Sequence, residues 1–201
     1  ISLGGVYEVK NKSTTIKEIT AKVFRQSDNA TLSLIWSPFP SPIYRKVAGN
    51  FETSFETAHP FKVEADTLAP AFVEFADKCA NMDEVSNNIL YPVVCATMPI
   101  FSQPNATLPI VDGAVRALPE YALAKIALND HFFWKADEYE MVITTIHSKG
   151  TFDKKYVFSL SDAESFRLRN NIDSVLISHV ANHFGIPVQV NTVAKDFKEK
   201  N

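Results

Sequence analysis

The sequence predicts an α+β fold with a mainly antiparallel sheet and about three helices, the longest near the C-terminus. Apolar and polar residues alternate through much of the first third, as in half-buried strands. An alternating hairpin and then a long apolar helical stripe fill the last third. Because helices and strands are segregated along the chain, an antiparallel sheet is favoured over a parallel one. We expect one domain over residues 1–201, with possible lobes at 1–66 (β-rich) and 67–201 (α+β).

Strands are predicted at residues 31–36, 51–55 and 61–65, where every second residue is apolar. The stretch 15–24 fits two structures. Ile16, Ile19 and Val23 have the spacing of a helix face, with Thr15 and Glu18 as a capping box. The same stretch also alternates as a strand from residue 19, and its β-branched residues favour the strand.

The middle of the chain predicts a helix over 66–79, a buried strand over 89–96 and a helix over 119–129. Apolar residues at helical spacing support the first, and a continuous apolar run supports the strand, although Pro92 weakens part of it. Pro119 suits the first turn of a helix, because the first amides of a helix have no partner within it.

Two strands, 138–147 and 154–160, flank a turn at 148–151 and read as a hairpin. A long helix is then predicted from Ser161 to Phe184. Ser161 and Glu164 form a capping box, and Gly185 marks the end of the helix. A short strand over 188–193 is expected to follow.

Composition excludes several classes of protein. The 201 residues include six glycines, none of them grouped into a phosphate-binding loop, so we expect no nucleotide or other cofactor. The formal net charge of −3 argues against nucleic acid as a partner. The longest apolar run, 89–101, contains two prolines and is too short to cross a bilayer, so no membrane association is expected.

Cys79 and Cys95 lie in apolar segments and are expected to be buried free thiols, with one disulfide as the alternative. Glycosylation sequons begin at Asn11, Asn29 and Asn105, but short motifs of this kind arise easily by chance. These observations favour an intracellular protein and leave a secreted one open.

Two sets of residues suggest metal chemistry. His179 and His183 are four residues apart on the predicted long helix, the spacing of the helical half of many zinc sites, although the glutamate of a metalloprotease motif is missing. The acids of 137–140, followed by Asp153 and Lys155, resemble the order in metal-dependent nucleases. In both cases the simpler interpretation is structural: histidines at the edge of a core, and a charged hairpin surface.

The segment 36–46 has the most unusual composition. Pro38, Pro40 and Pro42 favour extended backbone and remove amide donors, so residues 37–42 are expected along the surface or at a sheet edge. Aromatic and basic side chains flank the prolines and are the candidate binding residues: Trp36, Phe39, Tyr44, Arg45 and Lys46.

We therefore expect a non-catalytic binding or assembly protein that acts through protein–protein contacts, as a component of a larger complex, with residues 36–46 as the interface and another protein chain as the partner. Single-stranded nucleic-acid binding, by stacking of bases on the same aromatic residues, is the alternative. A metal-dependent hydrolase or nuclease is the second alternative.

Overall fold

The computed structural model describes residues 1–37, 39–47, 50–56, 58–77 and 85–200; within 2, 4–5, 39–47, 50–56, 70–72 and 77 it describes the backbone alone. The chain forms two compact units. The first unit comprises residues 1–78, 138–158 and 197–201, and the second comprises 79–137 and 159–196. Antiparallel sheets with several helices confirm the predicted α+β class. The division differs from the lobes expected at residue 66, because the hairpin of the last third belongs with the N-terminal strands.

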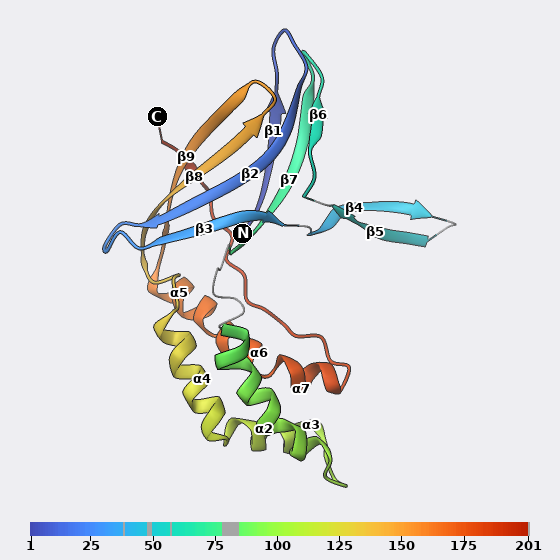
Figure 1. Ribbon diagram of the computed structural model, residues 1–201, viewed down its shortest axis with the longest axis vertical. Helices are drawn as coiled ribbons and strands as arrows, with labels where there is room; N and C mark the ends of the chain where they lie inside the picture. Colours follow the sequence, from blue (N-terminus) through green and yellow to red (C-terminus); the bar gives the residue numbers. More distant parts are fainter. Residues whose placement is uncertain (38, 48–49, 57, 78–84, 201) are drawn as a thin grey trace. The chain divides into compact units, whose positions relative to one another are not determined.

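The first unit is built on an antiparallel sheet with the strand order β1-β7-β3-β2-β8-β9-β10, and β6 pairs with part of β2 (Figure 1). The strands of this sheet are β1 (Ser2–Glu8), β2 (Thr14–Arg25), β3 (Thr31–Ser37), β6 (Phe61–Val63), β7 (Leu68–Asp77), β8 (Asp137–His147), β9 (Gly150–Leu160) and β10 (Lys198–Glu199).

Strand β2 lies between β3 and β8 and confirms the strand interpretation of residues 15–24. Ile16 pairs with His147 and Glu18 pairs with Ile146, so Lys17 is the extra residue of a β-bulge. The bulge keeps Ile16 and Ile19 buried on one face although they are three residues apart. The helix-like spacing in the sequence is therefore produced by a bulged strand.

Residues 68–77 form strand β7, so the helix predicted over 66–79 is wrong where the chain is described. Val73 and Phe75 are buried, whereas Glu74 and Ala76 are less so, which is the alternation of a strand. Strand β7 is held from both sides, because β1 pairs along one of its edges and β3 along the other. Pairing to two strands outweighs the helical spacing of the apolar residues.

The predicted hairpin is confirmed as β8 and β9, with a tighter turn at 148–149. Gly150 has a φ of 151°, a backbone conformation that favours glycine. The predicted strands over 51–55 and 31–36 are also present, the first as β5 (Asn50–Glu56) and the second within β3. Strand β5 pairs with β4 (Phe39–Val47) in a separate two-stranded sheet.

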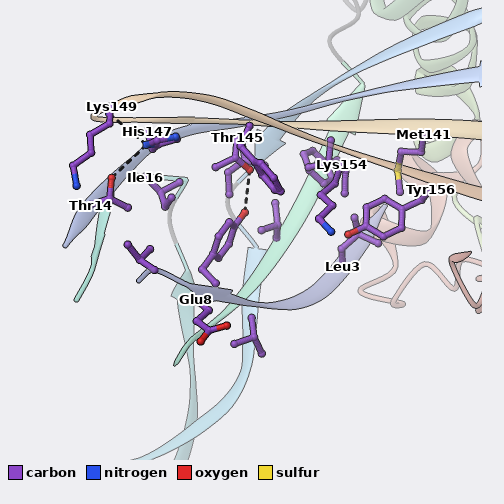
Figure 2. Close-up of a pocket in the computed structure, with 18 of the residues that line it drawn as sticks. Leu3, Glu8, Thr14, Ile16, Met141, Thr145, His147, Lys149, Lys154 and Tyr156 are labelled. Carbon is purple, nitrogen blue, oxygen red and sulfur yellow. Dashed lines mark hydrogen bonds between the residues drawn. The ribbon is translucent and has the colours of Figure 1, made fainter. Parts of the chain in front are cut away.

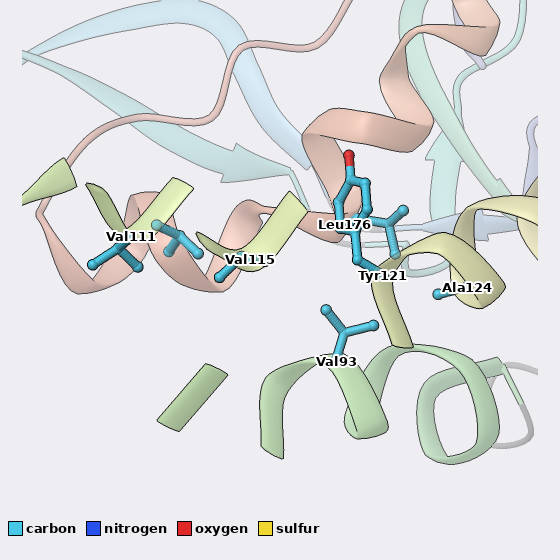
Figure 3. Close-up of a cluster of buried hydrophobic side chains, with 7 residues drawn as sticks. Val93, Val111, Val115, Tyr121, Ala124 and Leu176 are labelled. Carbon is cyan, nitrogen blue, oxygen red and sulfur yellow. The ribbon is translucent and has the colours of Figure 1, made fainter. Parts of the chain in front are cut away.

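The second unit is helical. Its elements are η1, a single π-helical turn (Ser86–Leu90), and the α-helices α2 (Tyr91–Phe101), α3 (Leu108–Arg116), α4 (Pro119–Asp130), α5 (Asp162–Arg169), α6 (Asn171–Leu176) and α7 (Ser178–His183). Helix α4 confirms the helix predicted over 119–129. The core of the unit gathers side chains from α2, α3, α4, α6 and α7 (Figure 3): Val93, Val111, Val115, Tyr121, Ala124, Leu176 and Val180.

The buried strand predicted over 89–96 is wrong, because these residues lie in η1 and α2. Pro92 occupies the first turn of α2, where a helix tolerates proline. Val93 and Thr97, one turn apart, are buried, whereas Tyr91 and Met98 are exposed. The apolar run therefore forms a helix with one buried and one exposed face. A continuous apolar sequence does not show which of its residues belong to which face.

The long helix predicted from Ser161 to Phe184 is divided into α5, α6 and α7, so the longest helix is not at the C-terminus. The capping box of Ser161 and Glu164 is confirmed at the start of α5. Near the first break, the side chain of Asn171 exchanges two hydrogen bonds with the backbone of Asn191. Near the second, the Ser178 hydroxyl donates to a backbone carbonyl at 2.7 Å. A side chain that bonds a carbonyl of its own helix, as Ser178 does, competes with the backbone hydrogen bonds of that helix.

The end of the C-terminal helical region matches the prediction, but the strand expected after it is absent. Gly185 follows α7 with a φ of 67°. Residues 188–193 form no strand, and the described chain next enters regular structure at β10.

A polar cluster joins α3, α4 and α6 beside this core. The Tyr121 hydroxyl donates to Asp173 at 2.8 Å and accepts from Arg116 at 3.0 Å. Lys125 forms an ion pair with Asp173 at 2.9 Å. Burial, together with the hydrogen bond to Asp173, raises the pKa of Tyr121 to about 12. The cluster satisfies the polar end of an otherwise buried ring.

Candidate functional site

The first unit encloses a cavity of about 960 Å³ (Figure 2). Its lining comes from β1, β2, β7, β8 and β9 and from Phe197 beside β10. Strand β1 begins the strand order and β9 and β10 end it, yet both regions line the same cavity. The sheet therefore curls, so that its two edges face one interior.

Most of the wall is apolar. On β7, β8 and β9, alternate residues point to the same face of the sheet and contribute to the cavity, whereas residues 6–10, at the end of β1 and in the loop after it, line it consecutively. The apolar lining residues are Leu3, Val6, Val9, Ile16, Ile19, Val73, Phe75, Met141, Ile143, Phe152 and Phe197.

One polar pair crosses the cavity. The Tyr7 hydroxyl on β1 lies 3.4 Å from the Thr145 hydroxyl on β8, and Figure 2 shows this contact as a dashed line. Burial raises the pKa of Tyr7 above its ordinary value, so its hydroxyl is neutral at physiological pH. The pair offers hydroxyl groups in an otherwise apolar section of the wall.

One end of the cavity is polar and basic, and we call it the histidine end: Thr14, His147 and Lys149 (Figure 2). The Thr14 hydroxyl lies 3.4 Å from Nδ1 of His147 and 3.0 Å from the Ser148 hydroxyl. Lys149 donates through Nζ to the Ser13 carbonyl at 3.3 Å. Two further lysines that line the cavity, Lys10 and Lys12, lie four and two residues before Thr14, respectively.

The other end, which we call the tyrosine end, contains Met141, Lys154 and Tyr156 (Figure 2). Lys154 forms an ion pair with Glu199 on β10. The Phe197 ring packs edge-on against Tyr156, with 6.3 Å between ring centroids. The C-terminal residues therefore close this end and neutralise its lysine.

Two large apolar side chains in the cavity lining remain exposed. Val6 is 61% exposed and Phe152 is 50% exposed. Apolar surface that stays in contact with water next to a cavity is surface that a bound apolar molecule would cover.

Of the candidate binding residues, Trp36 is not part of the cavity lining. Trp36, in β3, is partly buried and its ring packs edge-on against Phe61, at 6.1 Å between centroids. Phe39, Tyr44, Arg45 and Lys46 belong to β4, where the backbone is described and the side chains are not. Of the predicted extended stretch 37–42, the described residues from 39 on lie in β4, which is an edge strand as expected.

The candidate metal ligands His179 and His183 are engaged with Phe101 and Thr97 in the second unit. His183 stacks on the Phe101 ring at 4.0 Å, and Nε2 of His179 lies 2.9 Å from the Thr97 hydroxyl. Burial lowers the pKa of His179. In the described part of the chain, no three residues among the histidines, cysteines and acids are placed to hold a metal ion.

The acids of the nuclease-like pattern have structural partners. Glu140 pairs with Lys200 at 2.5 Å, and Asp153 accepts a hydrogen bond from Thr144 at 2.8 Å. Asp153 lies within β9, which begins at Gly150 and not at residue 154 as predicted.

Of the two cysteines, Cys79 falls outside the described residues. Cys95 is exposed on α2, which corrects the expected burial, because its segment is a helix and it lies on the outer face.

Sequence reasoning missed the cavity. The sequence pattern predicts no strand at β1 and a helix at β7. Two of the strands that line the cavity are therefore absent from the expected sheet. The alternation of residues 141–147 predicts a strand. It does not show that β1, at one edge of the sheet, lies opposite this strand across the cavity. The Lys-Asn-Lys sequence at 10–12, directly before β2, was the available signal for the basic end.

Across the described residues, no helix combines the length and the apolar character needed to cross a membrane. No known protein family matches this chain. No solved structure matches it either. A segment of 57 residues is 33% identical to an atrochrysone carboxyl ACP thioesterase of Claviceps purpurea (strain 20.1). That similarity covers 28% of this chain and 18% of the thioesterase, so it is a local likeness and shows no shared family.

Proposed function

We propose that the first unit is a non-catalytic binding module for an elongated, largely apolar small molecule held inside the curved sheet. The observation that carries the proposal is the cavity of about 960 Å³ with its apolar wall. This volume lies within the range of about 300–1,000 Å³ that is usual for small-molecule sites. Such sites combine an apolar wall with a few polar groups, and this cavity has the Tyr7–Thr145 pair and the histidine end.

The polar groups of the lining favour binding over catalysis. His147 is the histidine of the lining, and its Nδ1 contacts the Thr14 hydroxyl and the backbone amide of Lys149. Among the described residues no carboxylate contacts its ring, so the third group that orients the base in a catalytic triad is missing. The local likeness to a thioesterase is too short to bring that activity to this chain.

The test is binding of a neutral apolar fluorophore, N-phenyl-1-naphthylamine, whose emission rises in an apolar site. The wild-type protein is expected to bind it. Ile143→Trp, which fills the cavity from the middle of β8, is expected to abolish binding. Val142→Trp is the matched control, because residue 142 is adjacent on the same strand, faces the opposite side and does not line the cavity.

Thermal unfolding confirms that both tryptophan variants are folded. Absence of fluorophore binding in the wild type, or equal binding by two folded tryptophan variants, would contradict the proposal.

A second candidate function keeps the expected protein–protein contact. The observation that favours it is that β4 and β5 form a two-stranded sheet separate from the main one (Figure 1). An isolated two-stranded sheet is marginally stable in water, and its outer edges offer unpaired backbone groups to another strand. A partner that adds a strand to β4 or β5 would stabilise it.

A photo-crosslinking residue at position 44, in β4, tests this candidate. Exposure to light in the presence of host proteins should link this chain to one discrete partner. The same crosslinker in place of the exposed Lys22 on β2 is the control. If position 44 yields the same products as position 22, the hairpin has no specific partner.

A further inference from the structure

We infer that the molecule bound in the cavity is a single-chain amphiphile with an anionic head group, of which a long-chain fatty acid is the simplest case. Its head lies at the histidine end and its alkyl chain runs toward the tyrosine end. The inference rests on the proposed function and adds the chemistry and the orientation of the ligand.

The first step is the shape of the site. Met141, Ile143, Thr145 and His147 are alternate residues of β8 and all four line the cavity. Six residues of strand separate the first from the last, a span of roughly 20 Å. The two ends of the cavity are therefore well separated along β8, as Figure 2 shows for Met141 and His147. A long, narrow apolar molecule fits this arrangement better than a compact one.

The second step is the charge at the histidine end. In the described part of the chain, Lys10, Lys12 and Lys149 form no ion pair with a carboxylate. Thr14 and His147 add groups that can donate hydrogen bonds to an anion. Three uncompensated lysines at one end of an apolar cavity, in a chain with a net charge of −3, favour a ligand with a negative end.

The acidic groups near this end do not cancel that charge. Glu64 accepts from the Ser13 hydroxyl at 2.7 Å and pairs with Lys62 at 2.8 Å. Asp66 accepts from the backbone amide of Asn11 at 3.3 Å. Glu8 also lines the cavity, and Figure 2 shows it away from His147 and Lys149. Lys62 neutralises Glu64, whereas Asp66 keeps its charge and helps to hold the loop that carries Lys10 and Lys12. Three lysines against Glu8 and Asp66 leave this end net positive.

The third step is the contrast with the other end. Lys154 at the tyrosine end is already paired with Glu199, so an anionic head placed there would compete with a carboxylate of the chain itself. Phe197 and Tyr156 make that end aromatic. The apolar tail of an amphiphile is therefore matched to the tyrosine end and its head to the histidine end.

The experiment compares three ligands with the same alkyl chain, palmitate, hexadecyl phosphate and hexadecanol, by displacement of N-phenyl-1-naphthylamine. The variant Lys10→Met/Lys12→Met/Lys149→Met removes the three charges and keeps most of the alkyl stems. The matched control is Lys17→Met/Lys22→Met/Lys198→Met, at three exposed positions outside the lining.

In the wild type, at least one anionic ligand should bind about ten-fold or more tightly than hexadecanol, the effect expected of a charge-assisted hydrogen bond. The first variant should lose this preference while its affinity for hexadecanol stays unchanged, and the control variant should keep it. A preference for palmitate identifies a carboxylate head, and a preference for hexadecyl phosphate identifies a phosphate head.

Equal affinity for all three ligands, or a preference that survives in the first variant, would overturn the inference and leave the apolar site standing. Binding of none of the ligands, with no binding of the fluorophore, would overturn the proposed function as well.

Discussion

At the scale of single residues, polar side chains in this protein mainly satisfy backbone groups and one another. Glu164 is the clearest case. Its carboxylate accepts from the Ser161 amide at 2.9 Å and contacts Lys195 at 2.6 Å. The hydrogen bond from Lys195, with those from Ser161, lowers the pKa of Glu164 to about 2. The carboxylate therefore stays charged in mild acid.

This pKa gives a pH prediction with a definite sign. Because the pKa of Glu164 in the folded protein lies below its ordinary value of 4.5, its stabilising effect is complete above that value. The effect is lost as the pH falls toward 2. Carboxyl-carbon NMR of the folded protein should show Glu164 titrating near pH 2. In Lys195→Met the midpoint should move up toward 4.5, and a wild-type midpoint near 4.5 would contradict the described contacts.

The sequence predicts residue roles well where the cause is local. The capping box of Ser161 and Glu164 depends on residues three apart, and it is present. The environment of Trp36 depends on Phe61, which is distant in sequence, and that of Cys95 depends on which face of α2 meets the core. Burial of this kind is decided by tertiary packing, which a pattern of neighbouring residues does not contain.

At the scale of elements, the bulge at Lys17 sets the face that β2 presents to the cavity. Removing Lys17 should leave a regular ladder in which Ile16 and Ile19 still point inward, now two residues apart. Removing Lys22 from the regular part of β2 should turn part of the strand over. Either Val23 or Ile19, each almost fully buried, would then move toward water.

Urea unfolding of the two deletion variants tests this prediction. The Lys22 deletion should lower the free energy of unfolding by at least about 2 kcal/mol, the effect of exposing one such side chain. The Lys17 deletion should cost less. Equal destabilisation by the two deletions would show that the extra residue is not a bulge that keeps the two faces in register.

Leu176 tests the division of the C-terminal helix. It is 1% exposed and belongs to the core of the second unit, whereas Val175, next to it on α6, is 43% exposed. Leu176→Ala should lower the free energy of unfolding by about 2–5 kcal/mol, because it leaves a cavity in the core. Val175→Ala is the control and should change it by about 0.5 kcal/mol or less. Similar effects at both positions would mean that α6 is oriented differently.

Elements with strong local signals were predicted, and those defined by distant pairing were not. The hairpin β8–β9 and helix α4 were correct because a turn joins the two strands and Pro119 marks the start of the helix. Strand β7 was missed because the residues that it pairs with on β1 lie 60 to 72 positions away in the sequence. Side-chain hydrogen bonds lie next to the breaks on either side of α6, two of them between Asn171 and Asn191, and the apolar stripe does not reveal them.

At the scale of the whole molecule, both units are discontinuous in sequence. The first unit takes β8 and β9 from beyond a helical stretch of the second, and the second resumes after them. A sequence read from one end to the other therefore suggests lobes in chain order, as at residue 66. The prediction of the α+β class is correct because the class depends on which elements are present and not on how they are divided between units. The cavity could not be predicted from the sequence because its lining comes from distant segments of one unit, near residues 3, 19, 75, 143 and 197.

The most direct test of the central claim is methyl NMR of the intact protein during a titration with palmitate. Binding inside the curved sheet should shift the methyl signals of Ile16, Ile19 and Ile143, which line the cavity. The signals of Val111 and Val115, buried in the core of the second unit, should stay where they are. Shifts confined to the second unit, or no shift at the three isoleucines at saturating palmitate, would contradict the account.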